Sequence, residues 1–158
     1  NLQLAPVQSQ RDDQVSISFV WTASRKVVVS AGASAAQFTW DATIPVGVPI
    51  RLTTKRIPLS VRWFQGKHWF GEATATAVWQ QVVRQPGVPD PAGREQFTTL
   101  DLSVGYLLPR RLGTIMLDVR NLFDSEFFYQ DENFRSNDIR TPRYLPSRLA
   151  LLKFNLSF

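Results

Sequence analysis

Apolar and polar residues alternate with a period of two along most of this chain, and helical spacing is almost absent. The clearest run is FTTLDLSVGYLL, residues 97–108, in which one face collects the large apolar side chains of Leu100, Leu102, Val104 and Tyr106. Polar or small residues lie between them. Because successive side chains of a strand point to opposite faces, this pattern predicts a strand with one apolar face.

Similar stretches recur along the chain, so we expect about seven strands of roughly 9–14 residues, longer than the usual strand of about 5–6. The other six are QVSISFVW (14–21), KVVVSAGASAAQFTW (26–40), RIPLSVRWF (56–64), WFGEATATAVWQQVV (69–83), TIMLDVRNLF (114–123) and SRLALLKFNLSF (147–158). Two are less regular, because 26–40 and 69–83 are rich in alanine.

The connections alternate between short and long. Short turns fall at residues 22–26, 65–68 and 108–113, and long, proline-rich ones at residues 41–54, 84–96 and 124–147. This alternation is typical of a transmembrane β-barrel, and strands of about ten residues suit a tilted membrane crossing. We therefore expect an all-β fold, an antiparallel up-and-down transmembrane β-barrel of about seven or eight strands, with residues 1–158 in one domain.

A soluble sandwich or lipocalin-like barrel has a similar pattern with its apolar face inward, so alternation alone does not separate the two. Strand length, the alternating connections and charged residues on the polar faces favour the membrane. We expect these charges to line a wet lumen: Arg62, Asp101, Asp118, Arg120, Arg148 and Lys153. Aromatic residues near strand ends would form interfacial girdles. These are Trp21, Trp40, Trp63, Trp69, Trp79, Tyr106, Phe123 and Tyr144.

The composition gives few indications of a catalytic or binding function. The net charge is +5, but the basic residues form short, separated pairs rather than a stripe, so we expect no nucleic-acid partner. The absence of cysteine excludes disulfides and thiolate sites, and the single histidine, His68, lies in a predicted turn. Asp101 and Asp118 could face each other across a hairpin, but a solvated charge network is the simpler interpretation. We expect no catalytic residues, no cofactor, no metal site and no enzymatic activity.

The long connection at residues 124–147 interleaves aromatic and charged residues, as binding hot spots do. It is equally consistent with a lid whose aromatics pack on the rim of the barrel. The candidate recognition residues are Phe127, Phe128, Tyr129, Phe134, Arg135 and Arg140.

The last 60 residues carry a more specific pattern. Residues 97–130, with VRNLFD at 119–124, are followed by PRYLPSRLALLKFNLSF at 142–158. Together they resemble the C-terminal end of TonB-dependent outer-membrane receptors. The resemblance implies a bacterial cell outer-membrane barrel that takes up a scarce ligand such as a metal chelate or vitamin. It also implies that the barrel-assembly machinery reads the last strand, and by position this signal falls on Phe154, Leu156 and Phe158.

Two departures from that family shape the alternatives. Residues 1–13, ahead of the first predicted strand, do not contain the plug domain or TonB-interacting segment that the resemblance leads us to expect, and seven is an odd number, whereas bacterial single-chain barrels have an even one. We expect the chain to be the last third or quarter of a larger barrel, unless NLQLAPV at 1–7 forms an eighth strand. The expected partners are the lipid bilayer, the assembly machinery and a small-molecule or polymeric transport ligand. A passive porin or polysaccharide exporter, and a soluble barrel that binds an apolar ligand, remain alternatives.

Overall fold

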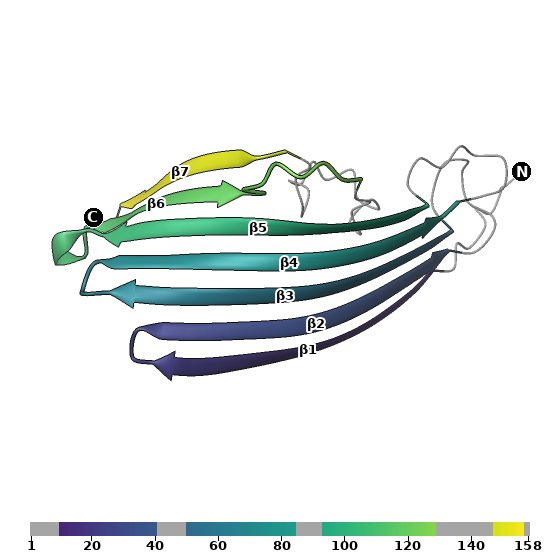
Figure 1. Cartoon of the computed structure of the whole chain (residues 1–158), viewed down its shortest axis with the longest axis horizontal. Coiled ribbons are helices and arrows are strands. Elements are labelled where there is room, and N and C mark those ends of the chain that lie inside the picture. Colours follow the sequence, from purple (N-terminus) through teal and green to yellow (C-terminus); the bar gives the residue numbers. More distant parts are fainter. Residues whose placement is uncertain (1–9, 41–49, 85–92, 129–146, 157–158) are drawn as a thin grey trace, which may run out of the picture.

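The chain folds into one antiparallel sheet of seven strands, whose order in the sheet follows their order in the sequence (Figure 1). The computed structural model describes residues 10–40, 50–84, 93–128 and 147–156. The strands are β1 (Gln10–Ser24), β2 (Val27–Trp40), β3 (Arg51–Gln65), β4 (Trp69–Val83), β5 (Arg94–Leu107), β6 (Gly113–Arg120) and β7 (Leu149–Leu156). A single turn of 3₁₀-helix, η1 (Pro109–Arg111), lies between β5 and β6. No helix in the described part of the chain is long and apolar enough to cross a membrane.

The all-β class and the antiparallel pairing predicted from the sequence are confirmed, and the described residues contain seven strands, where about seven or eight were predicted. The first five strands have 14 or 15 residues and the last two have eight. One predicted strand was too long at its C-terminal end. β6 stops at Arg120 instead of continuing to Phe123, because Asn121 takes a φ of 48°, which ends the extended chain.

The described sheet is open, so the prediction of a closed barrel is not confirmed. β1 and β7 are its two edges. In an up-and-down sheet, the first and seventh strands run in the same direction, as Figure 1 shows. They cannot pair with each other by the antiparallel ladder that joins all other neighbours. Antiparallel closure therefore requires an odd number of further strands. The eighth strand expected at residues 1–7 lies outside the described residues.

The register brings most large apolar positions to one face of the sheet. Residues directly opposite each other on neighbouring strands share a face, and one such row is Phe19, Ala31, Leu59, Ala75 and Leu100. We call this side the apolar face. The other side, which carries most of the Ser, Thr and charged residues at the alternate positions, is the polar face.

Buried apolar residues form two small clusters, and both lie on the polar face near the end with the long connections. One contains Phe38, Leu52 and Val82, and the other contains Val78, Phe97 and Phe127. The remainder of the sheet has no second layer among the described residues. Elsewhere the sheet is held mainly by its backbone ladders and by contacts between neighbouring side chains.

Two glycines on neighbouring strands let an aromatic ring lie flat on the sheet. A Cβ at Gly71 would lie 2.1 Å from the Trp63 ring on the apolar face. A Cβ at Gly105 would lie 2.1 Å from the Phe70 ring on the polar face. In both cases, the ring comes from the residue directly opposite the glycine. These glycines are therefore required for close packing rather than for a turn.

Candidate functional site

The apolar face extends across all seven strands, and many of its large side chains are exposed. Ile17 is 74% exposed, Ile57 50% and Leu152 59%, although β3 is an interior strand of the sheet. A monomeric soluble protein rarely leaves so large an apolar surface uncovered. Apolar surfaces of this extent are typical of sites that contact another protein or a membrane.

In β3, β4 and β5, the polar face is the more buried of the two sides. In β3, Leu52 and Thr54 are 1% exposed and Arg56 is 7% exposed, whereas Ile57 and Leu59 on the apolar face are about half exposed. In β4, the polar-face residues Thr76, Val78 and Gln80 are likewise buried. This is the reverse of the arrangement in a soluble sheet, where the apolar face is the one removed from water.

The apolar band has the height of a bilayer's hydrocarbon core. In β4 it runs from Gly71 to Ala77 and is bounded by Trp69 and Trp79. These tryptophans are ten residue steps apart, which is about 34 Å of strand; in a barrel whose strands tilt by about 40°, this would span about 26 Å along the axis. Membrane barrels present an apolar band of about 25 Å between aromatic girdles.

Four of the aromatic residues predicted to form girdles lie together at the end with the short turns. Trp21, Trp63, Trp69 and Tyr106 are all on the apolar face, and Trp69 meets Tyr106 edge-on at 4.9 Å between ring centroids. Trp79 marks the opposite edge of the band. Phe123 lies beyond β6 and is 72% exposed. The Trp40 side chain and Tyr144 are outside the described part.

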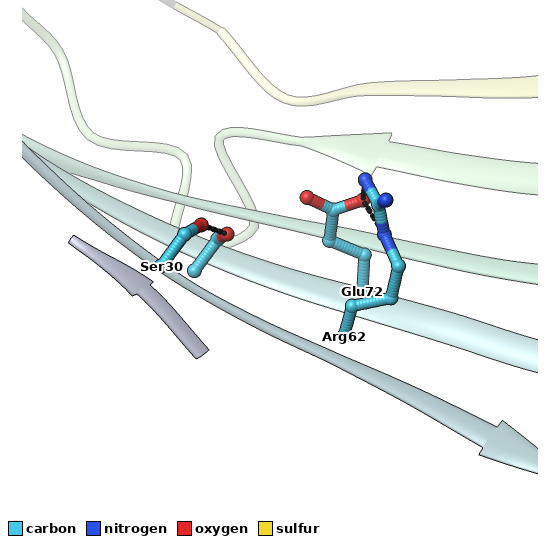
Figure 2. A network of polar contacts seen from close by, with 4 residues as sticks. Ser30, Arg62 and Glu72 are labelled. Carbon is cyan, nitrogen blue, oxygen red and sulfur yellow. Dashed lines mark hydrogen bonds and ion pairs between the residues drawn. The ribbon is translucent and has the colours of Figure 1, made fainter. Parts of the chain in front are cut away.

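Charged residues form a row across the polar face. The Arg62 guanidinium donates to the Glu72 carboxylate at 2.7 Å, as Figure 2 shows, and Ser103 lies opposite Glu72 on β5. Next in the row is Asp118 on β6, which is 6% exposed and accepts a hydrogen bond from the Lys153 ammonium. Figure 2 also shows Ser30 on this face, whose hydroxyl lies 2.6 Å from that of Ser60.

Three of the predicted lumen residues line one cavity on the polar face. A polar cavity of about 320 Å³ is lined by Glu72, Asp101, Asp118 and Arg120, so three predicted lumen residues share one space. Asp101 and Asp118 are not directly opposite each other across the hairpin, because the residue of β5 opposite Asp118 is Ser103.

Arg148 is the predicted lumen residue that the sheet does not contain. It precedes β7, and its backbone N–H donates to the Asp124 carboxylate at 2.6 Å. The side chain of Arg148 is exposed. This residue therefore anchors the start of the last strand through its main chain.

The VRNLFD element ends β6 in a turn that is held by side-chain hydrogen bonds. Asn121 is 2% exposed, its amide nitrogen donates to the Ser125 carbonyl at 2.9 Å, and its amide oxygen accepts from the Ser125 N–H at 3.0 Å. Its backbone N–H donates to the Asp101 carboxylate at 2.8 Å. Asparagine suits this position because it tolerates a positive φ and its side-chain amide can bond to the backbone of the turn. The alternation of apolar and polar residues did not predict this role.

The candidate recognition loop is described only at its start. The Phe127 ring stacks on Phe97 with 3.9 Å between centroids and is 8% exposed, as the lid interpretation expects. Phe128 is 60% exposed, as the recognition interpretation expects. Tyr129, Phe134, Arg135 and Arg140 lie outside the described residues.

The proposed assembly signal lies on the apolar face of β7. Phe154 is 62% exposed and Leu156 is 55% exposed, while Phe158 is outside the described residues. The described residues contain no group of three or more His, Asp or Glu side chains that could hold a metal ion.

Comparisons with protein-family models, with characterised proteins and with solved structures give no match to this chain.

Proposed function

We propose that this chain forms part of the wall of a transport barrel in the bacterial outer membrane, with its apolar face toward lipid and its polar face toward an aqueous lumen. The resemblance of residues 97–130 and 142–158 to TonB-dependent receptors makes uptake of a scarce ligand, such as a metal chelate or vitamin, the proposed task.

The observation that carries the proposal is the combination of an exposed apolar face and a more buried polar face. A soluble barrel that binds an apolar ligand would enclose Ile57 and Leu59 and expose Thr54 and Arg56. The structure has the opposite burial at all four positions. In a lipid bilayer such an apolar face is not exposed to water, because the bilayer core is itself apolar.

The open edges support a barrel larger than the seven described strands. A lipid-exposed strand edge leaves backbone N–H and C=O groups without partners, at several kcal/mol for each group by order of magnitude. β1 and β7 therefore need neighbours in a membrane, and antiparallel closure needs an odd number of additional strands. This agrees with the expectation of a larger barrel, of which this chain would supply one wall.

The charge row bears on the alternative of a polysaccharide exporter. A basic lumen would suit an anionic polysaccharide, but two of the predicted lumen cations are paired, Arg62 with Glu72 and Lys153 with Asp118. The four charges of the row sum to zero, so the face offers little net attraction to an anionic polymer. We therefore keep receptor-type uptake as the proposed function.

Refolding tests the membrane part of the proposal. The urea-unfolded chain is diluted into buffer and, separately, into phosphatidylcholine vesicles, and β-content and heat-modifiable gel migration are recorded. A β-rich, heat-modifiable species that forms only with lipid is the expected result, and because β1 and β7 need neighbours, it should contain partner strands from further copies of the chain. A soluble β-rich monomer in buffer would contradict it. For the uptake part, dissipating the inner-membrane potential in cells that carry the full-length gene should stop ligand uptake, whereas uptake through a passive pore would continue.

A further inference from the structure

A cavity of about 640 Å³ lies on β3, β4 and β5 at the end of the sheet with the long connections. Its apolar-face walls come from two adjacent rows of the register. One row places Lys55, Trp79 and Gln96 side by side, and the other places Thr53, Gln81 and Arg94 side by side. Two cations, two amides, a hydroxyl and an indole therefore surround one space.

This cavity sits where the apolar face becomes polar. The next row toward the centre of the sheet contains Ile57 and Ala77, and the row after it contains Leu59, Ala75 and Leu100. Trp79 occupies the boundary, as interfacial tryptophans do. A molecule in the cavity would thus place one end among cations and the other along an apolar wall.

The electrostatics of the cavity favour an anion. Lys55 and Arg94 are exposed, and on the apolar face of β3, β4 and β5 no acidic residue accompanies them. Asp13, an acid on the apolar face of β1, is paired with Arg11 at 2.7 Å. Two residues of the polar face, Gln80 and Glu95, also line the cavity. The Glu95 carboxylate accepts the Phe128 backbone N–H at 3.3 Å, so the two cations face one carboxylate that already has a hydrogen-bond donor.

We propose that this cavity binds the phosphate headgroup of an anionic membrane lipid, with Lys55 and Arg94 as the cationic ligands of the phosphate and Trp79 against its glycerol region. The acyl chains would lie along the apolar face over Ala75 and Ala77, between the larger side chains of Leu59 and Leu100. The inference rests on the proposed function, because a lipid reaches this site only if the apolar face lies in a bilayer.

Quenching of Trp79 by brominated lipids tests the proposal. The full chain, with the other four tryptophans replaced by phenylalanine, is folded into phosphatidylcholine vesicles that contain a fixed fraction of brominated phosphatidylglycerol or brominated phosphatidylcholine. A cation at an anionic membrane surface contributes roughly a fivefold preference. Two such cations should make the phosphatidylglycerol selectivity at Trp79 roughly 25-fold. In case the four substitutions impair folding, the same quenching measurement is made on the unsubstituted chain and on its Trp79→Phe variant. The difference between the two quenching values then gives the contribution of Trp79.

The test variant is Lys55→Gln/Arg94→Gln, and the matched control is Lys26→Gln/Lys67→Gln, which removes two exposed cations from the short turns at the opposite end. The test variant should lose most of the selectivity, and the control should retain it. Equal quenching by both lipids, loss of selectivity in the control, or its survival in the test variant would each overturn the proposal.

Two further arms distinguish a bound lipid from a dissolved phosphate, and failure of this site from failure of the proposed function. If dissolved glycerol 3-phosphate at millimolar concentration competes as well as the lipid, the site binds a free phosphate and the lipid assignment is wrong. If the chain fails to insert into either kind of vesicle, the proposed function itself fails, and the lipid site fails with it. Insertion with equal quenching by both lipids would refute the lipid site alone.

Discussion

An arginine in the middle of the apolar face should be far more costly than one at the adjacent position of the same strand. Ala75 lies on the apolar face of β4 between Leu59 and Leu100, with further apolar rows on both sides. Thr74 is its neighbour on the polar face and lies opposite Asp101. Both are partly exposed residues of an interior strand, so they form a matched pair.

The magnitude follows from where each new side chain must go. An arginine at the lipid-facing midplane of a membrane barrel costs about 2–4 kcal/mol of folding free energy, or roughly a 30- to 900-fold change in the folding equilibrium. Thr74→Arg would enter the polar cavity of about 320 Å³ that Asp101 also lines. We expect its cost to stay within about 1 kcal/mol, because the new charge finds water and a carboxylate.

The assay is a urea titration of the chain folded in phosphatidylcholine vesicles, with tryptophan emission and heat-modifiable migration as readouts. In water, an exposed substitution at either position would change the stability by about 0.5 kcal/mol or less. Equal effects of Ala75→Arg and Thr74→Arg would therefore refute the assignment of the apolar face to lipid.

Three further substitutions test the packing, and each is measured by the same titration. Gly71→Ala should cost about 1–3 kcal/mol, because its Cβ would overlap the Trp63 ring, and Trp63→Ala should relieve most of that cost in the double variant; additive costs would contradict the overlap. Asn121→Ala should cost about 2–3 kcal/mol, because it removes the side-chain hydrogen bonds and alanine is strained at a positive φ. Asn121→Gly should cost less than Asn121→Ala, because glycine relieves the backbone strain but does not restore the hydrogen bonds. Lys153→Met should cost about 1–3 kcal/mol by leaving the buried Asp118 carboxylate without its ammonium, and adding Asp118→Asn should restore part of the loss; no coupling would show that the pair is not formed.

Much of the sheet could be predicted from residue alternation. The faces assigned to residues 97–108 and 56–64 are those observed, since a period of two fixes which side chains share a face. Alternation does not fix where a strand ends. The end of β6 depends on the buried Asn121 amide and on Asp101, a residue 20 positions away in the sequence.

The charge pairing was beyond the reach of the sequence. Arg62, Asp118 and Lys153 were predicted to share a polar face, but the order of charges along a chain does not reveal which will pair. Pairing depends on the register between strands, which places Glu72 opposite Arg62. The cationic cavity was missed for the same reason, because Lys55 and Arg94 are far apart in the sequence and meet only through β4.

The central claim is that β3 has lipid on one side and water on the other. The chain has no cysteine, so single cysteines can be placed at each position from 57 to 62 and labelled with a nitroxide. The measurement is the accessibility of each label to oxygen, which concentrates in lipid, and to a water-soluble nickel complex, in phosphatidylcholine vesicles. We predict an alternation with a period of two, with oxygen favoured at Ile57, Leu59 and Val61 and nickel at the positions between them. Uniform accessibility to nickel along the strand, or an alternation of the opposite phase, would contradict the claim.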